Sequence, residues 1–192
     1  MWSEWGRTTR FLNSTRIAFA REQALWHNLE LADRSAARIH TVSGPARYRV
    51  SLDDHIHALG DEQLLHGAIL IYSYTLVESQ AGDYLGLSTR NLGGIEDWAQ
   101  RLLRRIGRTW GDVLDGKAGL VEVTVVRNAL AHGIQRMDQR GINRMVSAGS
   151  TFGWSVGERV EISFDQLRLY RDRLRSLLRL AFPTRPGSRR IT

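Results

Sequence analysis

Cysteine is absent from this chain of 192 residues. Without thiols the protein can form no disulfide bond and no thiolate metal site, which fits a reducing, intracellular compartment. Long hydrophobic runs are absent too. The longest uncharged apolar stretch, 67–77, falls short of the roughly 18 residues that span a membrane, and it predicts a buried helix. The first ten residues, MWSEWGRTTR, contain no apolar signal core. We therefore expect a cytoplasmic protein without a membrane segment.

Lysine is almost absent, since Lys117 is the one lysine among 27 basic residues. The formal net charge is nevertheless +7, and arginine supplies nearly all of it. Guanidinium groups bind phosphate through paired hydrogen bonds and stack on bases, so this composition favours nucleic acid as a partner. A general bias of composition toward arginine would give the same excess without any function, and both interpretations stay open.

Apolar residues recur at helical spacing in most of the chain. A capping-box pattern, Ser163 to Gln166, marks the start of the last such segment. The sequence predicts helices over 9–38, 51–59, 61–85, 95–106 and from 163 to about 180.

The stretch 142–162 has a different pattern. Gly149, Gly153 and Gly157 separate short β-branched or aromatic segments, which is typical of a β-hairpin. The expected fold class is therefore all-α, a bundle of four to five helices with a small β-hairpin insertion between the last two helices. The length favours one domain over 1–182, and the polar, basic segment 183–192 predicts a disordered tail.

The segment 121–133, VEVTVVRNALAHG, combines a packing face with a chemically equipped one. Its helical period continues to Gly133, the expected stop, although a strand over 121–126 is an alternative. His132 then lies in the last turn, near carbonyls that favour a protonated imidazole, and is positioned to titrate near neutrality. On a helix, the polar arc comprises Thr124, Arg127, Asn128, Ala131 and His132, opposite Val123, Val125, Val126, Ala129 and Leu130.

The motif Arg127-Asn128-Ala-Leu-Ala-His132 resembles the Arg-x4-6-His signature of the HEPN superfamily. Similar spacings occur elsewhere in this arginine-rich chain, for example from Arg21 to His27, so the bare pattern is not specific. Three details support the central match: an Asn follows the Arg, the motif ends a predicted helix, and a Gly follows the His. The surroundings over 61–180, with an acidic residue on the apolar second helix and ISFDQLRLYRDRL after the motif, resemble the RNA-ligase-associated and phage-defence branch.

The resemblance implies a metal-independent endoribonuclease that needs no cofactor and acts as a toxin or phage-defence effector. RNA would be the substrate, two chains would form a homodimer with a composite active site, and an antitoxin or defence-system protein is a possible partner. In such a site a 2′-hydroxyl attacks the adjacent phosphorus, a histidine moves a proton, and a guanidinium offsets the growing charge. We assign these roles to His132 and Arg127, with Asn128 orienting either group and Glu78 supporting them.

Six further arginines are candidates for RNA contact. They lie on the outward face of the helix predicted over 95–106 and just after the motif: Arg101, Arg104, Arg105, Arg108, Arg136 and Arg140. The plainer alternative treats such ridges, including the arginines at 168–179 of the last helix, as solvated faces. His55 and His57 have no third ligand nearby, so no metal site is expected. The alternative function is a non-catalytic module that binds RNA or another protein.

Overall fold

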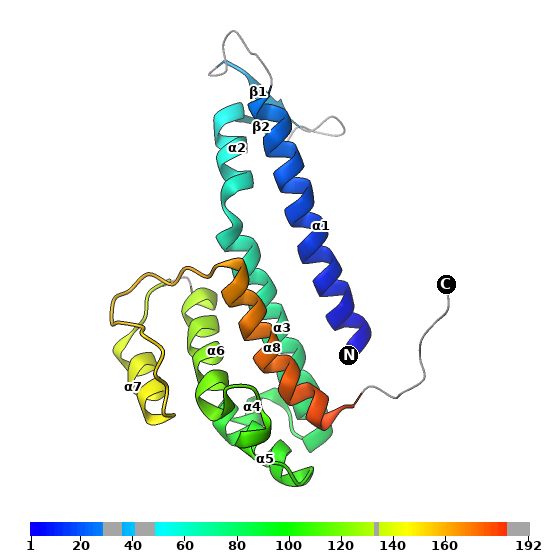
Figure 1. Cartoon of the computed structure of the whole chain (residues 1–192), viewed down its shortest axis with the longest axis vertical. Helices are drawn as coiled ribbons and strands as arrows, with labels where there is room; N and C mark the ends of the chain where they lie inside the picture. Colours follow the sequence, from blue (N-terminus) through cyan, green and yellow to red (C-terminus); the bar gives the residue numbers. More distant parts are fainter. Residues whose placement is uncertain (29–35, 41–48, 133–134, 184–192) are drawn as a thin grey trace. The chain divides into compact units, whose positions relative to one another are not determined.

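The structure, a computed structural model, describes residues 1–28, 36–40, 49–132 and 135–183. These residues form eight α-helices, a short 3₁₀ helix and one two-stranded antiparallel sheet, so the predicted all-α class is confirmed (Figure 1). The chain divides into a smaller compact unit, 6–65, and a larger one made of 1–5 and 66–192. Two compact units can belong to one domain, so the single domain expected over 1–182 stays a prediction. Apart from Pro183, the predicted disordered tail lies outside the described residues.

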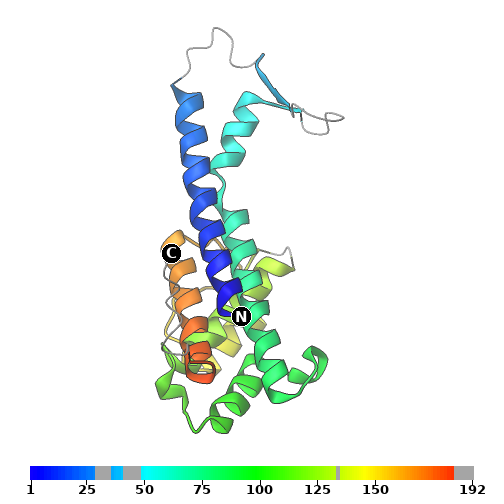
Figure 2. The same ribbon diagram turned by 90° about the vertical axis from the view of Figure 1, so that its right-hand side faces the viewer.

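The smaller unit contains most of the first helix, a hairpin and a short helix. Its elements are α1 (Trp2–His27), β1 (Arg38–His40), β2 (Arg49–Ser51), α2 (Leu52–Gly60) and the first turn of α3 (Glu62–Leu85). In both views α1 and α2 lie side by side (Figures 1 and 2), and Glu22 Oε1 lies 3.8 Å from His55 Nε2. The Ser51 hydroxyl caps α2 by accepting a hydrogen bond from the backbone N–H of Asp54, as the sequence predicts.

Two boundaries in this unit differ from the prediction. The helix expected over 9–38 begins at Trp2 and ends at His27, and a short antiparallel hairpin, with Arg38 opposite Ser51, was not foreseen. The first eight residues are mostly polar, so the sequence did not indicate that the helix begins there. Strands of three residues are too short for an alternating pattern to become visible.

The larger unit is built around the helix that carries the motif. Its elements are the rest of α3, α4 (Thr89–Leu92), α5 (Ile95–Arg105), η1 (Trp110–Asp112), α6 (Gly116–Ala131), α7 (Gln139–Ser147) and α8 (Phe164–Ala181). α6 contacts α5, α7 and α8, and Figure 1 shows α7 and α8 on opposite sides of it. Val121, Val123 and Val126 are fully buried. Each such valine stabilises the fold by roughly 1.5–3 kcal/mol.

The β-hairpin predicted over 142–162 is wrong in position. Residues 139–147 form α7, and the chain then returns with a single bridge between Arg136 and Arg159. The Asp138 carboxylate caps α7 by accepting from the backbone N–H of Gly141 at 2.6 Å. Because an aspartate cap and the inward-facing Met145 favour a helix, the β-branched residues there did not decide the local structure.

The arginine face expected on α8 is not fully solvated. Arg171 is 7% exposed and Arg173 is completely buried. Arg173 donates to Asp115 Oδ2 at 2.7 Å and to Glu122 Oε2, while Trp154 Nε1 also donates to Glu122. This buried network ties α8 and the segment after α7 to the first half of α6.

None of the described helices combines the length and the apolar character needed to cross a lipid bilayer.

Candidate functional site

The motif occupies the last turn of α6. The helix predicted here is confirmed, and the alternative strand over 121–126 is wrong. His132 follows the helix as its C-cap, with its backbone N–H donating to the Asn128 carbonyl at 3.1 Å, whereas Gly133 lies outside the described residues. The predicted polar arc exists only at this end, because Thr124 is buried and its hydroxyl donates to the Leu120 carbonyl. The chemically accessible part of α6 is therefore its carboxyl-terminal turn.

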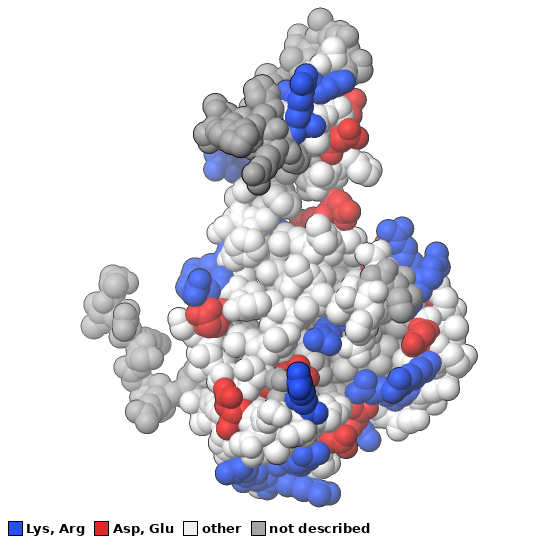
Figure 3. Space-filling view, turned by 180° about the vertical axis from the view of Figure 1, so that it is seen from behind, with Lys and Arg blue, Asp and Glu red and all other residues white. Residues whose placement is uncertain are grey.

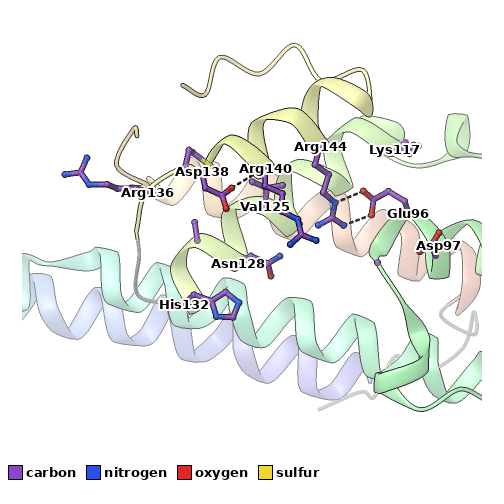
Figure 4. Close-up of a pocket in the computed structure, with 14 residues that line it drawn as sticks. Glu96, Asp97, Lys117, Val125, Asn128, His132, Arg136, Asp138, Arg140 and Arg144 are labelled. Carbon is purple, nitrogen blue, oxygen red and sulfur yellow. Dashed lines mark hydrogen bonds and ion pairs between the residues drawn. The ribbon is translucent and has the colours of Figure 1, made fainter. Parts of the chain in front are cut away.

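A pocket of about 730 Å³ lies beside this turn (Figure 4). Asn128 and His132 line it from the motif, and His132 is exposed. The facing wall comes from α7 and from the segment before it. The basic residues that line the pocket as a whole are Lys117 of α6, Arg136, Arg140 and Arg144. The structure thus brings together two motif residues and two of the predicted RNA-contacting arginines.

Arg127 does not line this pocket. Its guanidinium carbon lies 4.9 Å from the ring centre of Tyr74 on α3, and its Nη1 donates to Asn128 Oδ1 at 2.9 Å. Its Nε is buried and has no hydrogen-bond partner in the described part of the chain. Arg127 therefore acts on the pocket through Asn128, not by reaching into it.

Glu78 lies on α3 near Arg127 and also outside the pocket lining. Burial raises the pKa of its carboxyl above the usual range, and the positive charge of Arg127 opposes this only in part. Tyr74, which lies one turn before Glu78 on α3, is 3% exposed, and burial raises the pKa of its hydroxyl. Glu78, Tyr74 and Arg127 thus form a partly buried layer behind Asn128 and His132, the motif residues that line the pocket.

Acidic side chains offset part of the positive charge in the pocket. Arg144 donates two hydrogen bonds to Glu96 at the start of α5, the Nε–Oε1 distance being 2.6 Å. Burial alone would raise the pKa of Glu96, but the hydrogen bonds from Arg144 and from its own backbone outweigh it and lower that pKa. Asp138 is occupied in capping α7. Arg140 and Lys117 form no ion pair with any described residue.

The four arginines predicted on or just after α5 are exposed but stand apart from the pocket. Arg108 lies 3.6 Å from Asp112, and the Arg105 guanidinium lies 5.1 Å from the ring centre of Tyr84. Arg101 and Arg104 are also exposed. On the face in Figure 3, basic side chains gather in separate groups with acidic side chains between them. None of these four arginines lines the pocket.

Sequence reasoning missed two basic pocket residues, Lys117 and Arg144, and the acidic residues Glu96, Asp97 and Asp138. Arg144 follows Arg140 by four positions, so a helix places both on one face. The capping aspartate at 138 was the signal for that helix, and the hairpin prediction concealed it. Lys117 carried no comparable signal. In the described residues no three His, Asp or Glu side chains lie close enough together to hold a metal ion.

Comparison with known proteins gives no matching family model, no similar curated protein and no similar solved structure. The resemblance to the HEPN superfamily therefore rests on the motif and its sequence context alone.

Proposed function

We propose that this protein is a metal-independent endoribonuclease of the HEPN type. The observation that supports this most directly is that Asn128 and His132 of the motif line an arginine-rich pocket at the end of the central helix. A solvent-accessible imidazole beside cationic side chains suits a phosphodiester substrate, because it can move a proton where negative charge develops.

In the proposed reaction the 2′-oxygen attacks the adjacent phosphorus and the bond to the 5′-oxygen breaks, which leaves a 2′,3′-cyclic phosphate. One proton leaves the 2′-hydroxyl and one joins the departing 5′-oxygen. His132 carries out a proton transfer, and the cationic lining of the pocket offsets charge on the phosphoryl oxygens. Each effect is worth roughly 10²-fold to 10³-fold in rate.

A homodimer remains part of the proposal. Within one chain Arg127 and His132 do not share the pocket, since Arg127 is held against Tyr74. A second copy would supply a second imidazole, so that one histidine accepts the proton of the 2′-hydroxyl and the other donates a proton to the departing 5′-oxygen. Sedimentation equilibrium tests this point, and a strictly monomeric yet active enzyme would contradict it.

The test of catalysis uses purified protein and structured RNA in EDTA. We expect cleavage products with 2′,3′-cyclic phosphate ends and their loss in His132→Ala. His57→Ala is the matched control, because His57 is an exposed histidine of the smaller unit. Cleavage that required a divalent cation, or that survived His132→Ala, would overturn the proposal.

The alternative is a non-catalytic module that binds RNA or another protein. The engagement of Arg127 with Tyr74 and Asn128 favours it, because this guanidinium is not directed at a substrate. Under this alternative RNA binding would fall steeply with salt as phosphate contacts release counterions, and no product would form.

The biological setting that we propose is a cytoplasmic toxin or phage-defence effector. Its motivation is the resemblance of the motif to that branch of the superfamily, and a partner protein would then hold the enzyme inactive. Expression of the chain alone should be toxic, and co-expression of an adjacent gene should relieve the toxicity. Toxicity that His132→Ala leaves unchanged would contradict this setting.

A further inference from the structure

We infer that the guanidinium that binds phosphate in the pocket belongs to Arg140 of α7, and not to Arg127 of the motif. The inference rests on the proposed function in one respect, which is that the phosphate is a phosphodiester of RNA. It assigns a binding role to a residue that the motif does not contain.

The first step is that the other arginines of this region are engaged. Arg127 stacks on Tyr74 and donates to Asn128. Arg144 is neutralised by its two hydrogen bonds to Glu96. Arg136 donates to the Gly157 carbonyl at 2.7 Å, and its side chain points away from Asn128 and His132 (Figure 4).

Lys117 is excluded by distance. It lies fifteen positions before His132 on the same helix, which corresponds to about 22 Å along the axis. Figure 4 shows it beyond Glu96, at the end of the pocket remote from His132. A phosphate beside the imidazole is therefore out of its reach, and Arg140 is the remaining cation.

The position of Arg140 is fixed by the packing of α7. Gly141, the next residue, approaches α6 so closely that a Cβ there would lie 2.7 Å from Val125 Cγ1. Met145 is buried, and Arg144 ties the same helix to α5. The first turn of α7 thus holds Arg140 on the pocket wall, with its side chain directed toward the side occupied by Asn128 and Arg144 (Figure 4).

Charge makes this position suited to an anion. The Arg140 and Arg144 side chains project into the pocket from the same face of α7. Arg144 forms an ion pair with Glu96, whereas Arg140 forms none with a described residue, although Asp97 and Asp138 also line the pocket. The guanidinium of Arg140 presents two parallel N–H groups, a geometry that matches two oxygens of a phosphodiester. Asn128 adds a donor, because its Oδ1 is taken by Arg127 and its Nδ2 group remains.

The experiment measures binding, so it does not depend on cleavage. Inorganic phosphate, and a short oligoribonucleotide with methylated 2′-hydroxyls, are titrated while the imidazole resonances of the six histidines are followed by NMR. The His132 signal is identified by its loss in His132→Ala. In the wild type both probes should shift this signal, since a bound anion changes the electrostatic surroundings of the imidazole.

Arg140→Ala should weaken oligoribonucleotide binding by about tenfold or more and should remove the phosphate-induced shift of His132. Arg140→Lys should recover only part of the affinity, because an ammonium cannot form the paired hydrogen bonds. Arg159→Ala, the matched control, removes an exposed arginine that does not line the pocket, and it should change affinity less than about twofold. Unchanged melting temperatures confirm that all three variants fold.

Three outcomes of the binding experiment would overturn the inference: no shift of His132 in the wild type, wild-type binding by Arg140→Ala, or equal losses in Arg159→Ala and Arg140→Ala. The proposed function fails separately. Binding that depends on Arg140 without any cleavage refutes the nuclease and leaves the phosphate site, whereas full cleavage by Arg140→Ala refutes the phosphate site and leaves the nuclease.

Discussion

The first two residues of the motif are bonded to each other: Arg127 Nη1 donates to Asn128 Oδ1 at 2.9 Å. This contact orients the amide, because the oxygen faces the guanidinium and the Nδ2 group is left as a donor. Tyr74, buried behind the motif, holds the guanidinium in place through its ring. The motif arginine is thus bound within the protein, and the asparagine is the member of the pair that reaches the pocket.

The variant Asn128→Asp separates two roles of the amide, which accepts a hydrogen bond from Arg127 and offers a donor to the pocket. A carboxylate still accepts from Arg127, so the melting temperature should stay within about 2 °C of the wild type or rise. The donor is lost and a negative charge faces the pocket, so RNA affinity should fall by about tenfold or more. Asn143→Asp on α7 is the control, since Asn143 also serves as an acceptor, from Gln139, but does not line the pocket. Equal affinities for the two variants would show that Asn128 does not contact RNA.

The buried pair of Glu122 and Arg173 predicts a large effect on stability. Glu122→Gln leaves the Arg173 charge in the interior with Asp115 as its remaining carboxylate partner, and should lower the free energy of unfolding by about 3 kcal/mol. Urea denaturation measures this loss. Arg168→Met on the same helix α8 should change it by less than about 0.5 kcal/mol, because Arg168 is exposed. A Glu122→Gln protein as stable as Arg168→Met would mean that the network contributes nothing net.

The Glu96–Arg144 pair predicts a dependence of stability on acidity. The pKa of Glu96 is lowered in the folded protein, so the unfolded chain binds more protons around pH 4 and stability rises with pH there. The contribution is present above the unfolded pKa, near 4.3, and is lost as the pH falls through the folded value. Unfolding free energies measured from pH 3 to 6 should therefore depend less on pH in Glu96→Gln than in the wild type. If the unfolding free energy depends on pH equally in both proteins, the Glu96–Arg144 pair does not contribute to the loss of stability in acid.

The helical parts of the fold were predictable where one apolar stripe repeats over several turns. The long helix expected over 61–85 and the last helix from its capping box at Ser163 agree closely with α3 and α8. The segment 142–162 was mispredicted because its glycines and β-branched residues are common to hairpins and loops. In this segment the hydrogen bond from the backbone N–H of Gly141 to Asp138 caps the start of α7, and this cap outweighs the strand propensity of the β-branched residues.

Of the residues that line the pocket, the sequence singled out Asn128 and His132 of the motif and the arginines Arg136 and Arg140. The catalytic roles of His132 and Asn128 stay a prediction. The burial of an arginine cannot be inferred from residue type alone. Arg127 and Arg173 are both arginines on helices that pack in the interior, and aromatic rings and carboxylates far away in sequence keep them there. Glu78 lies near Arg127, as its supporting role requires, and its function stays a prediction.

The close approach of α7 to α6 predicts a coupled loss of stability and binding. In Gly141→Ala the new methyl group would lie 2.7 Å from Val125 Cγ1, and the structure must shift by moving α7. We expect a loss of about 1–3 kcal/mol in unfolding free energy, and weaker RNA binding as Arg140 is displaced. Gly153→Ala is the control, because a Cβ there meets nothing within 4 Å.

A second substitution tests whether the clash with Val125 causes the loss of binding in Gly141→Ala. Val125→Ala removes the nearer of the two atoms that the added methyl group would strike, the other being Asp138 Oδ1 at 2.9 Å, so the double variant Val125→Ala/Gly141→Ala should bind RNA better than Gly141→Ala alone. Such compensation would tie binding to the seating of α7. If Gly141→Ala binds RNA as tightly as the wild type while losing stability, α7 does not position the phosphate contact, and the basic wall of the pocket has no part in recognition.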